Sequence, residues 1–348
     1  LEYNQKYSVK KNEEIIKLES EGKISEAQNV REGIIRGKDE RETLCPYYKL
    51  HRMTIRSLIT GFVEGLRDPR VGAQGAVRPE VKTREEAINM GRQTIANEIW
   101  PTMIVELQPP NGDIVWEWHI WDHLIQDVDE SLPNYGIIEE HPELQDVNYG
   151  NAGSNNGPGG PNGDWKHFNA VAYNADLDQI AISSRHHDEI YIIDHSTTTE
   201  EAAGHTGGNS GMGGDYLYRW GNPEAYNRGT NSNHLLGDQH GVNWIPEGYP
   251  GAGNLIIFNN QYTHNNSAVF EIETPLNEYG TYSVTDGEPF GPDAPEWFHT
   301  SNFHTQMQGG AFRLPNGNTL ITDCDDAHMF EVTSEHEVVW EHNYSGGQ

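Results

Sequence analysis

The chain has 348 residues, enough for one large domain or two ordinary ones, and a formal net charge of −30. So acidic a balance argues against nucleic acid and anionic membranes as partners, and no apolar run reaches the ~18–20 residues of a membrane span. It fits a protein in a salty or extracellular setting, where charge is screened. The acidic balance therefore leads us to expect an extracytoplasmic (periplasmic or secreted) location. The chain begins with Leu1, so we expect a processed or trimmed start.

The charge changes abruptly near residue 100. Residues 1–100 carry 18 Lys and Arg against 16 Asp and Glu, whereas residues 101–348 carry 5 against 37. Trp100 is the first of nine tryptophans. We therefore predict a helix-rich N-terminal region over 1–100 and a second domain over 101–348. Cys45 and Cys324, one in each region, could pair, and two free thiols fit the sequence about equally well.

The N-terminal region has the spacing of amphipathic helices. Apolar residues at helical intervals predict helices over 10–40 and 51–66. The sequence TREE at 83–86 predicts a capping box that starts a third, short helix. We expect that helix to end just before Pro101.

After residue 101 the pattern changes to short strands. Strands at 103–107 and 113–118, joined by the turn PPNG at 109–112, predict a hairpin. Residues 148–164 are rich in Gly, Asn and Pro and predict a loop. Three similar units follow, each with four short strands and a closing Trp. They span 168–220, 241–297 and 310–340.

Four antiparallel strands repeated in this way predict blades of a β-propeller, with the hairpin as the outer half of an earlier blade. The predicted fold class is therefore mainly β, with about three and a half blades visible. A β-sandwich is the rival interpretation, but it does not require the four-strand period or the recurrent Trp. We expect Trp116, Trp220, Trp297 and Trp340 to pack in the core or between blades.

Histidines stand where the innermost strands of these units begin. His167 and His240 lie seven and six residues upstream of the turns that end those strands, so we expect both to face one axial space. The third unit has Gln308 in this register, with His304 just upstream. Any single one of the 17 histidines is more often structural, but several units that deliver imidazole to one face predict an anion site.

The positions between the second and third strands carry further candidates. His328 follows the acidic turn at 324–327, and Arg185 and His186 hold the comparable place in the first unit. Imidazoles and a guanidinium around a channel suit an anionic substrate, because they stabilise charge on the oxygens of a transferring group. A neutral histidine can also act as a nucleophile.

Other polar residues have simpler interpretations. His195 and His205 flank a loop and are interpreted as loop-packing residues. Asp323, Asp325 and Asp326 could bind a cation such as structural calcium, but an acidic turn is the default interpretation. No tight ligand spacing predicts a catalytic metal, and no cofactor is expected.

In these stretches the sequence resembles the propeller-type arylsulfotransferase family, from about residue 82 to 345. The matching segments are DWKHFN at 164–169, SSRH at 183–186, IDHSTTTEEAAGHTGG at 193–208, YRWGNP at 218–223, DQH at 238–240 and RLPNGNTL at 313–320. The resemblance implies a six-bladed propeller. It also implies transfer of a sulfuryl group from an aryl sulfate to a phenol through a transiently sulfated histidine.

The resemblance also implies roles for particular residues. Carried over by motif, His167 and His240 bind the sulfuryl oxygens and shuttle the proton. His304 is the expected nucleophile, and His328 is the alternative. The expected substrate-binding residues are Asn169, Arg185, His186 and His264.

The sequence departs from the family in two ways. An arginine expected after the strand at 255–260 is missing, because the chain continues with Gln261; His264 or Arg185 is a candidate replacement. Residues 1–80 do not resemble the opening blades, so the helical region replaces part of the ring, another chain completes it, or the sequence is composite or partial. A sulfotransferase is the leading hypothesis. The alternatives are a non-catalytic propeller that acts as a binding or assembly module, and a lectin-like binder of anions or calcium.

Overall fold

The computed structural model describes residues 76–95, 97–108, 113–152 and 163–344, which all belong to the unit 56–348. Several predicted features lie outside these residues, namely the helices at 10–40 and 51–66, the turn at 109–112, and Cys45 with its pairing to Cys324. Most of the predicted loop at 148–164 also lies outside them. Among the described residues, no helix is long and apolar enough to cross a membrane.

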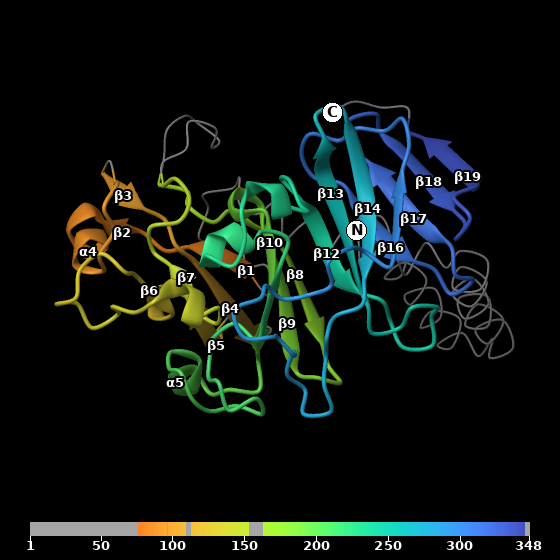
Figure 1. Ribbon diagram of the computed structural model, residues 1–348. Helices are drawn as coiled ribbons and strands as arrows, with labels where there is room; N and C mark the ends of the chain where they lie inside the picture. The colour runs from red at the N-terminus through yellow and green to blue at the C-terminus, as the bar shows by residue number, and fades with distance from the viewer. Residues whose placement is uncertain (1–75, 96, 109–112, 153–162, 345–348) are drawn as a thin grey trace, which may run out of the picture. The chain divides into compact units, whose positions relative to one another are not determined.

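Three four-stranded antiparallel sheets follow one another along the chain (Figure 1). The first contains β8 (Phe168–Asn174), β9 (Gln179–Ser184), β10 (Glu189–Asp194) and β11 (Tyr218–Trp220). The second contains β12 (His240–Trp244), β13 (Leu255–Thr263), β14 (Asn266–Ile272) and β15 (Trp297–Thr300). The third contains β16 (Gly310–Arg313), β17 (Thr319–Asp323), β18 (His328–Val332) and β19 (Val338–Asn343). The strands pair in sequence order within each sheet, which confirms the three predicted units.

A three-stranded sheet precedes them. It pairs β4 (Thr102–Gln108) with β5 (Asp113–His119), which confirms the predicted hairpin, and adds β1 (Ala76–Pro79), which the sequence did not predict. Smaller pairs and single-turn helices complete the described chain. They are β2 (Lys82–Thr83) with β3 (Glu98–Ile99), β6 (Leu124–Ile125) with β7 (Gln145–Asp146), η2 (Ile120–Asp122), η3 (Ile138–Glu140), η4 (Arg185–His187), η5 (Pro223–Tyr226) and η6 (Asn231–Asn233).

The capping box predicted at 83–86 is present at the start of α4 (Arg84–Asn89). Thr83 Oγ1 accepts from the Glu86 amide at 3.2 Å, and Glu86 Oε2 accepts from the Thr83 amide at 2.7 Å. The prediction that this helix runs to Pro101 is wrong. Gly91 turns the chain with a φ of +85°, and a Cβ there would lie 2.6 Å from Gln126 Cγ, so the helix ends at Asn89.

The innermost strands of the three sheets are neighbours. β12 packs beside both β8 and β16. Two side-chain hydrogen bonds join these strands: Asn169 Nδ2 donates to the Gln239 carbonyl at 2.8 Å, and Asn243 Nδ2 donates to the Ala311 carbonyl at 3.0 Å. The described fold is thus mainly β, with its four-stranded sheets meeting at their first strands. A closed six-bladed ring and a domain boundary at residue 100 stay predictions.

The four tryptophans differ in burial. Trp116 and Trp220 are buried in the core, as predicted. Trp297 packs against the third sheet, where its Nε1 donates to the Ser334 carbonyl at 3.0 Å. Trp340 is 39% exposed, so the packing prediction is wrong for it, because β19 is the outer strand of its sheet and all its residues are exposed. Trp297 also begins its strand rather than closing it.

Candidate functional site

Two chain segments meet at the edge where β8 begins and β9 ends. His167 comes directly before β8, and η4 follows β9, so antiparallel pairing places both at one edge. The Arg185 amide donates to the His167 carbonyl at 3.1 Å. His167 and Asp188 have φ values of +49° and +53°, a left-handed backbone that costs about 1–2 kcal/mol in residues other than glycine. Such conformations are concentrated at binding and catalytic sites.

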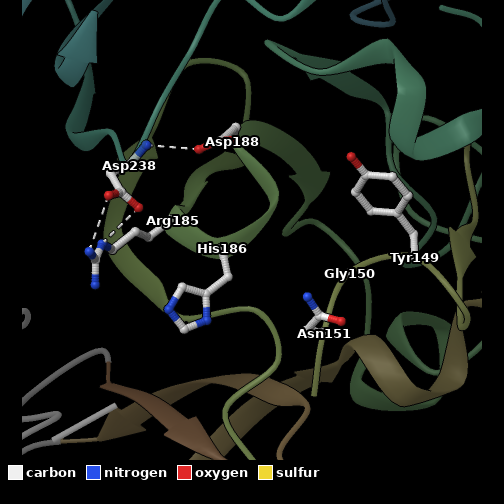
Figure 2. A pocket seen from close by; sticks show the side chains of 7 residues that line it. All are labelled: Tyr149, Gly150, Asn151, Arg185, His186, Asp188 and Asp238. Atoms are coloured by element: carbon white, nitrogen blue, oxygen red, sulfur yellow. Dashed lines mark hydrogen bonds and ion pairs between the residues drawn. The ribbon is translucent and has the colours of Figure 1, made fainter. Parts of the chain in front are cut away.

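A pocket of about 290 Å³ opens at this edge (Figure 2). Figure 2 shows the His186 side chain between Arg185 on one side and Asn151 on the other. The lining residues are Tyr149, Gly150, Asn151, Arg185, His186, Asp188 and Asp238. The sequence predicted Arg185 and His186 as site residues and missed Tyr149, Asp188 and Asp238. Asp238 could have been found, because it stands in the same DQH segment as His240.

Acidic groups surround Arg185. Its Nη2 donates to Asp238 Oδ2 at 3.3 Å, and its Nε lies 3.2 Å from Asp238 Oδ1 (Figure 2). Asp188 Oδ1 accepts from the Asp238 amide at 2.8 Å. Burial raises the pKa of Asp188 to about 7, with the nearby Asp238 and Glu189 charges adding to the effect. The carboxyl of Asp188 is therefore about half protonated at neutral pH, which reduces the negative charge that faces the pocket.

His167 and His186 form a pair with Asp164. His167 Nδ1 lies 2.5 Å from Asp164 Oδ2, and the two imidazole rings are 4.8 Å apart. Burial opposes ionisation of Asp164, but the hydrogen bond and charge of His167 outweigh it and hold the pKa of Asp164 below its usual value. Burial lowers the pKa of His186, so this imidazole is neutral at pH 7. One donor atom from each of the three residues lies within 4.8 Å of the others, so the group could also hold a cation.

His240 begins β12 and its ring is fixed by two oxygen acceptors. Its Nδ1 lies 2.8 Å from Asn260 Oδ1 and 3.0 Å from the Asp238 carbonyl, so Nδ1 carries the proton and Nε2 keeps its lone pair. Burial lowers the pKa of His240 to about 4. The imidazole is therefore neutral at physiological pH. The nearby Arg185 and His167 charges contribute to this shift.

Comparison with known proteins decides the family. The arylsulfotransferase family model matches residues 83–284, more than half of the chain. The chain belongs to the arylsulfotransferase family. The family match includes His167, Arg185, His186 and His240 and stops before His304 and His328.

Solved structures give only distant likeness. The chain is similar to a protein of unknown function from Bacteroides caccae (10% identity, TM-score 0.33, 70% of this chain and 55% of that one). It is also similar to a streptogramin B lyase, with 8% identity and a TM-score of 0.29 over 77% of this chain and 59% of that one. The Dos1 propeller is similar at 10% identity and a TM-score of 0.29, over 72% of this chain and 55% of that one. It thus spans 55–59% of the length of these three proteins. No curated protein matches it significantly.

The other residues that the arylsulfotransferase resemblance implied, His304, His328, His264 and Asn169, do not line the pocket. His304 lies before β16, beside Thr305, whose carbonyl accepts from Asn260 Nδ2 at 2.9 Å, so one asparagine joins the His240 and His304 segments. His328 is on the third strand of its sheet, where its Nε2 lies 3.2 Å from Glu341 Oε2. His264 is exposed and is not among the residues that line the pocket. Asn169 is buried beside β12.

Several buried polar atoms make no hydrogen bond within the described part of the chain. They include Asn169 Oδ1, Arg185 Nε, His186 Nδ1, both ring nitrogens of His187, Gln239 Oε1 and His304 Nδ1. His187 is fully buried against Tyr149 and Trp165, and burial lowers its pKa well below the usual value, so it is a neutral packing residue. Arg185 and His186, in contrast, line the pocket. A buried polar atom of this kind calls for an explanation, and a bound polar ligand is one.

Proposed function

We propose that this chain transfers a sulfuryl group from an aryl sulfate to a phenolic acceptor through a sulfated histidine. The observation that carries the proposal is that Arg185, His186 and Asp238, from two segments of the family match, line one pocket. His167, from a third segment, does not line the pocket, but its ring lies 4.8 Å from that of His186. The pocket edge contains buried nitrogens without hydrogen-bond partners among the described residues. Such groups are suited to bind the oxygens of a sulfate ester.

The binding step rests on Arg185 and His186. His186 Nδ1 is buried and without a hydrogen-bond partner in the described residues. Asp238 pairs with both Nε and Nη2 of Arg185, so Nη1 is the guanidinium nitrogen that can face a ligand oxygen while the side chain stays anchored. Arg185 thereby takes the place of the arginine that is missing after β13.

The transfer step assigns His304 as the nucleophile. Its Nδ1 is buried without a partner in the described chain, and the backbone beside it is anchored because Thr305 Oγ1 donates to Asp323 Oδ1 at 2.6 Å. A ring nitrogen of His304 attacks sulfur, the bond from sulfur to the aryl oxygen breaks, and the aryl oxygen leaves with a proton from His167. In the second step the oxygen of the acceptor phenol attacks the sulfur, the bond from sulfur to the His304 nitrogen breaks, and the proton of the phenol returns to His167.

Asp164 and His240 position these groups. The Asp164 carboxylate orients His167 through the 2.5 Å contact at Nδ1 and stabilises its protonated form. His240 presents a neutral Nε2 lone pair, which accepts a hydrogen bond from the acceptor hydroxyl. His328 fits the nucleophile's role less well, because it lies on a third strand and contacts Glu341.

The test is a single-turnover experiment with a fluorogenic aryl sulfate labelled with ³⁵S. We expect a burst of phenol release, with the label retained on the protein and lost when an acceptor phenol is added. His304→Ala should remove both the burst and the label. His328→Ala and the exposed control His342→Ala should keep both. Retention of the label in His304→Ala with its loss in His328→Ala would move the nucleophile to His328.

Two other outcomes separate the alternatives. Saturable binding of the aryl sulfate without any burst would favour a non-catalytic binding module. Activity that is lost on treatment with EDTA and restored by a divalent cation, together with cation binding that His186→Ala removes, would favour a cation held by Asp164, His167 and His186. An extracytoplasmic location, which the acidic composition suggests, is part of the proposal, and cell fractionation tests it.

A further inference from the structure

We propose that His123, His205 and Asp215 form a binding site for a divalent transition-metal ion, with zinc the best match. One donor atom from each of these residues lies within 4.8 Å of the other two. Asp215 Oδ1 lies 2.7 Å from His123 Nδ1 and 2.8 Å from His205 Nδ1. The metal-site cluster, as we call these three residues, is formed in the long loop between β10 and β11 and in the segment after β5.

The metal-site cluster is separate from the pocket. Arg185, His186 and Asp188 precede β10, whereas His205 and Asp215 follow it. The six residues of β10 span roughly 20 Å at about 3.3 Å per residue. The loop that carries the cluster includes α5 (Thr199–Ala202), which packs against β5 (Figure 1).

Proton counting at His123 points to a cation. His123 is fully buried, and both of its ring nitrogens face oxygen acceptors: Nδ1 faces Asp215, and Nε2 lies 2.9 Å from the Ala202 carbonyl. A neutral imidazole has one N–H, so it can satisfy only one of these contacts. The second contact therefore needs another proton, on the ring or on Asp215, or a metal ion at Nδ1.

The surroundings of His123 match those of a metal ligand. A metal-binding histidine usually donates its other N–H to a carbonyl or carboxylate, which fixes the ring and the tautomer. Ala202 supplies such a carbonyl at the end of α5. The indole of Trp118 stacks on the imidazole at 5.6 Å, and its Nε1 donates to the Gly214 carbonyl at 2.7 Å, so one residue holds both His123 and the backbone next to Asp215.

Gly214 allows this close approach. A Cβ at Gly214 would lie 2.0 Å from the Ala202 carbonyl oxygen and 2.7 Å from His123 Nε2. Any larger residue would therefore separate Asp215 from His123. This packing explains the glycine at position 214.

The donor set selects the class of metal. Two imidazoles and one carboxylate are typical ligands of zinc, whereas calcium and magnesium prefer oxygen ligands. His205 is 59% exposed, so solvent can supply a fourth ligand and the ring can move outward to reach metal-ligand distances. A bound ion would join the segment after β5 to the loop between β10 and β11.

The experiment uses the whole protein, freed of metal by EDTA dialysis and titrated with Co²⁺ and then Zn²⁺. We expect one equivalent of Co²⁺ to give the intense visible absorption of a tetrahedral site, and Zn²⁺ to displace it. His205→Ala and Asp215→Asn should each lower the affinity at least about 100-fold, because each removes a ligand.

His141→Ala is the matched control. His141 is also an exposed imidazole whose Nδ1 contacts one carboxylate oxygen, that of Glu143 at 2.8 Å, but it lies outside the metal-site cluster. Its substitution should leave the titration unchanged. His205→Ala is expected to fold, because it leaves the buried residues His123 and Asp215 in place. If His205→Ala does not fold, Asp215→Asn serves as the second variant, because asparagine has the same shape as aspartate. Absence of saturable Co²⁺ binding, or binding that both variants leave unchanged, would overturn the proposal.

Discussion

The first and third sheets have the same left-handed backbone at two matching positions but carry different side chains around them. His167 and Gln308 both precede an innermost strand with left-handed φ values of +49° and +68°. Asp188 and Ala327 both end the turn between the second and third strands, at +53° and +49°. The strand and turn pattern therefore repeats to within about 20° of φ, although none of these four residues is glycine.

The side chains on that shared backbone have opposite character. The first turn carries Arg185, whose guanidinium pairs with Asp238, and His186, whose buried Nδ1 lacks a hydrogen-bond partner in the described chain. The third turn is acidic, and two of its carboxylates accept hydrogen bonds: Asp325 Oδ2 from the Gln306 amide at 2.8 Å, and Asp323 Oδ1 from Thr305 Oγ1 at 2.6 Å. These contacts agree with the interpretation of 323–326 as an acidic turn, and the proposed function makes the first sheet the binding side.

The largest expected effect is on kcat/KM, when the turn at 185–188 is changed and the comparable turn at 324–327 is left intact. Arg185→Met should lower kcat/KM for an aryl sulfate by about 10²–10³-fold, the usual cost of losing one charge-stabilising donor. Asp326→Asn, an exposed position in the comparable turn of the third sheet, should leave kcat/KM unchanged. Steady-state kinetics of both variants measure this, and equal losses in the two would show that the sheets do not differ in the way proposed.

A smaller effect concerns stability and pH. The pKa of Asp188 is raised to about 7 in the fold, above its usual value of about 3.9 when unfolded. Its contribution to stability is therefore present at low pH and is lost as pH rises from about 4 through 7. Asp188→Asn removes this loss. The difference in free energy of unfolding, variant minus parent, should therefore be about 2 kcal/mol more favourable to the variant at pH 8 than at pH 5.

Urea unfolding at the two pH values measures the difference. Ala327→Asn is the control, because it introduces the same amide at the comparable left-handed position without removing an ionisable group. That variant should show no extra pH dependence. If the free energy of unfolding changed with pH by the same amount in the parent and in Asp188→Asn, the raised pKa of Asp188 would be contradicted.

The smallest effect tests the shared backbone itself. Gln308→Gly should raise the free energy of unfolding by about 0.5 kcal/mol, because glycine adopts a left-handed φ without strain and this gain exceeds its entropy cost in the unfolded chain. His167→Gly should give no gain, because it also removes the contact with Asp164. Thermal unfolding compares the two, and a clear stabilisation by His167→Gly would show that the Asp164 contact contributes little.

The sequence by itself determined the repeating part of this protein. Alternating strands, turn residues and the capping box at Thr83 depend on neighbours a few positions apart, so the three four-strand units could be predicted with nearly correct bounds. The same local pattern placed His167 and His240 at the starts of innermost strands. The local pattern predicted an α4 that is too long, because the close approach of Gln126 to Gly91, which are 35 residues apart, cannot be read from neighbouring residues.

Only the tertiary structure decided the chemistry of the sites. The tautomer of His240 depends on Asn260, 20 residues away, and the surroundings of His123 depend on Asp215, 92 residues away. Sequence reasoning interpreted His205 as a loop-packing residue and had no signal for His123. Burial, charge and hydrogen bonding depend on which distant segments meet, and that is why the strands could be predicted from the sequence and the state of each imidazole could not.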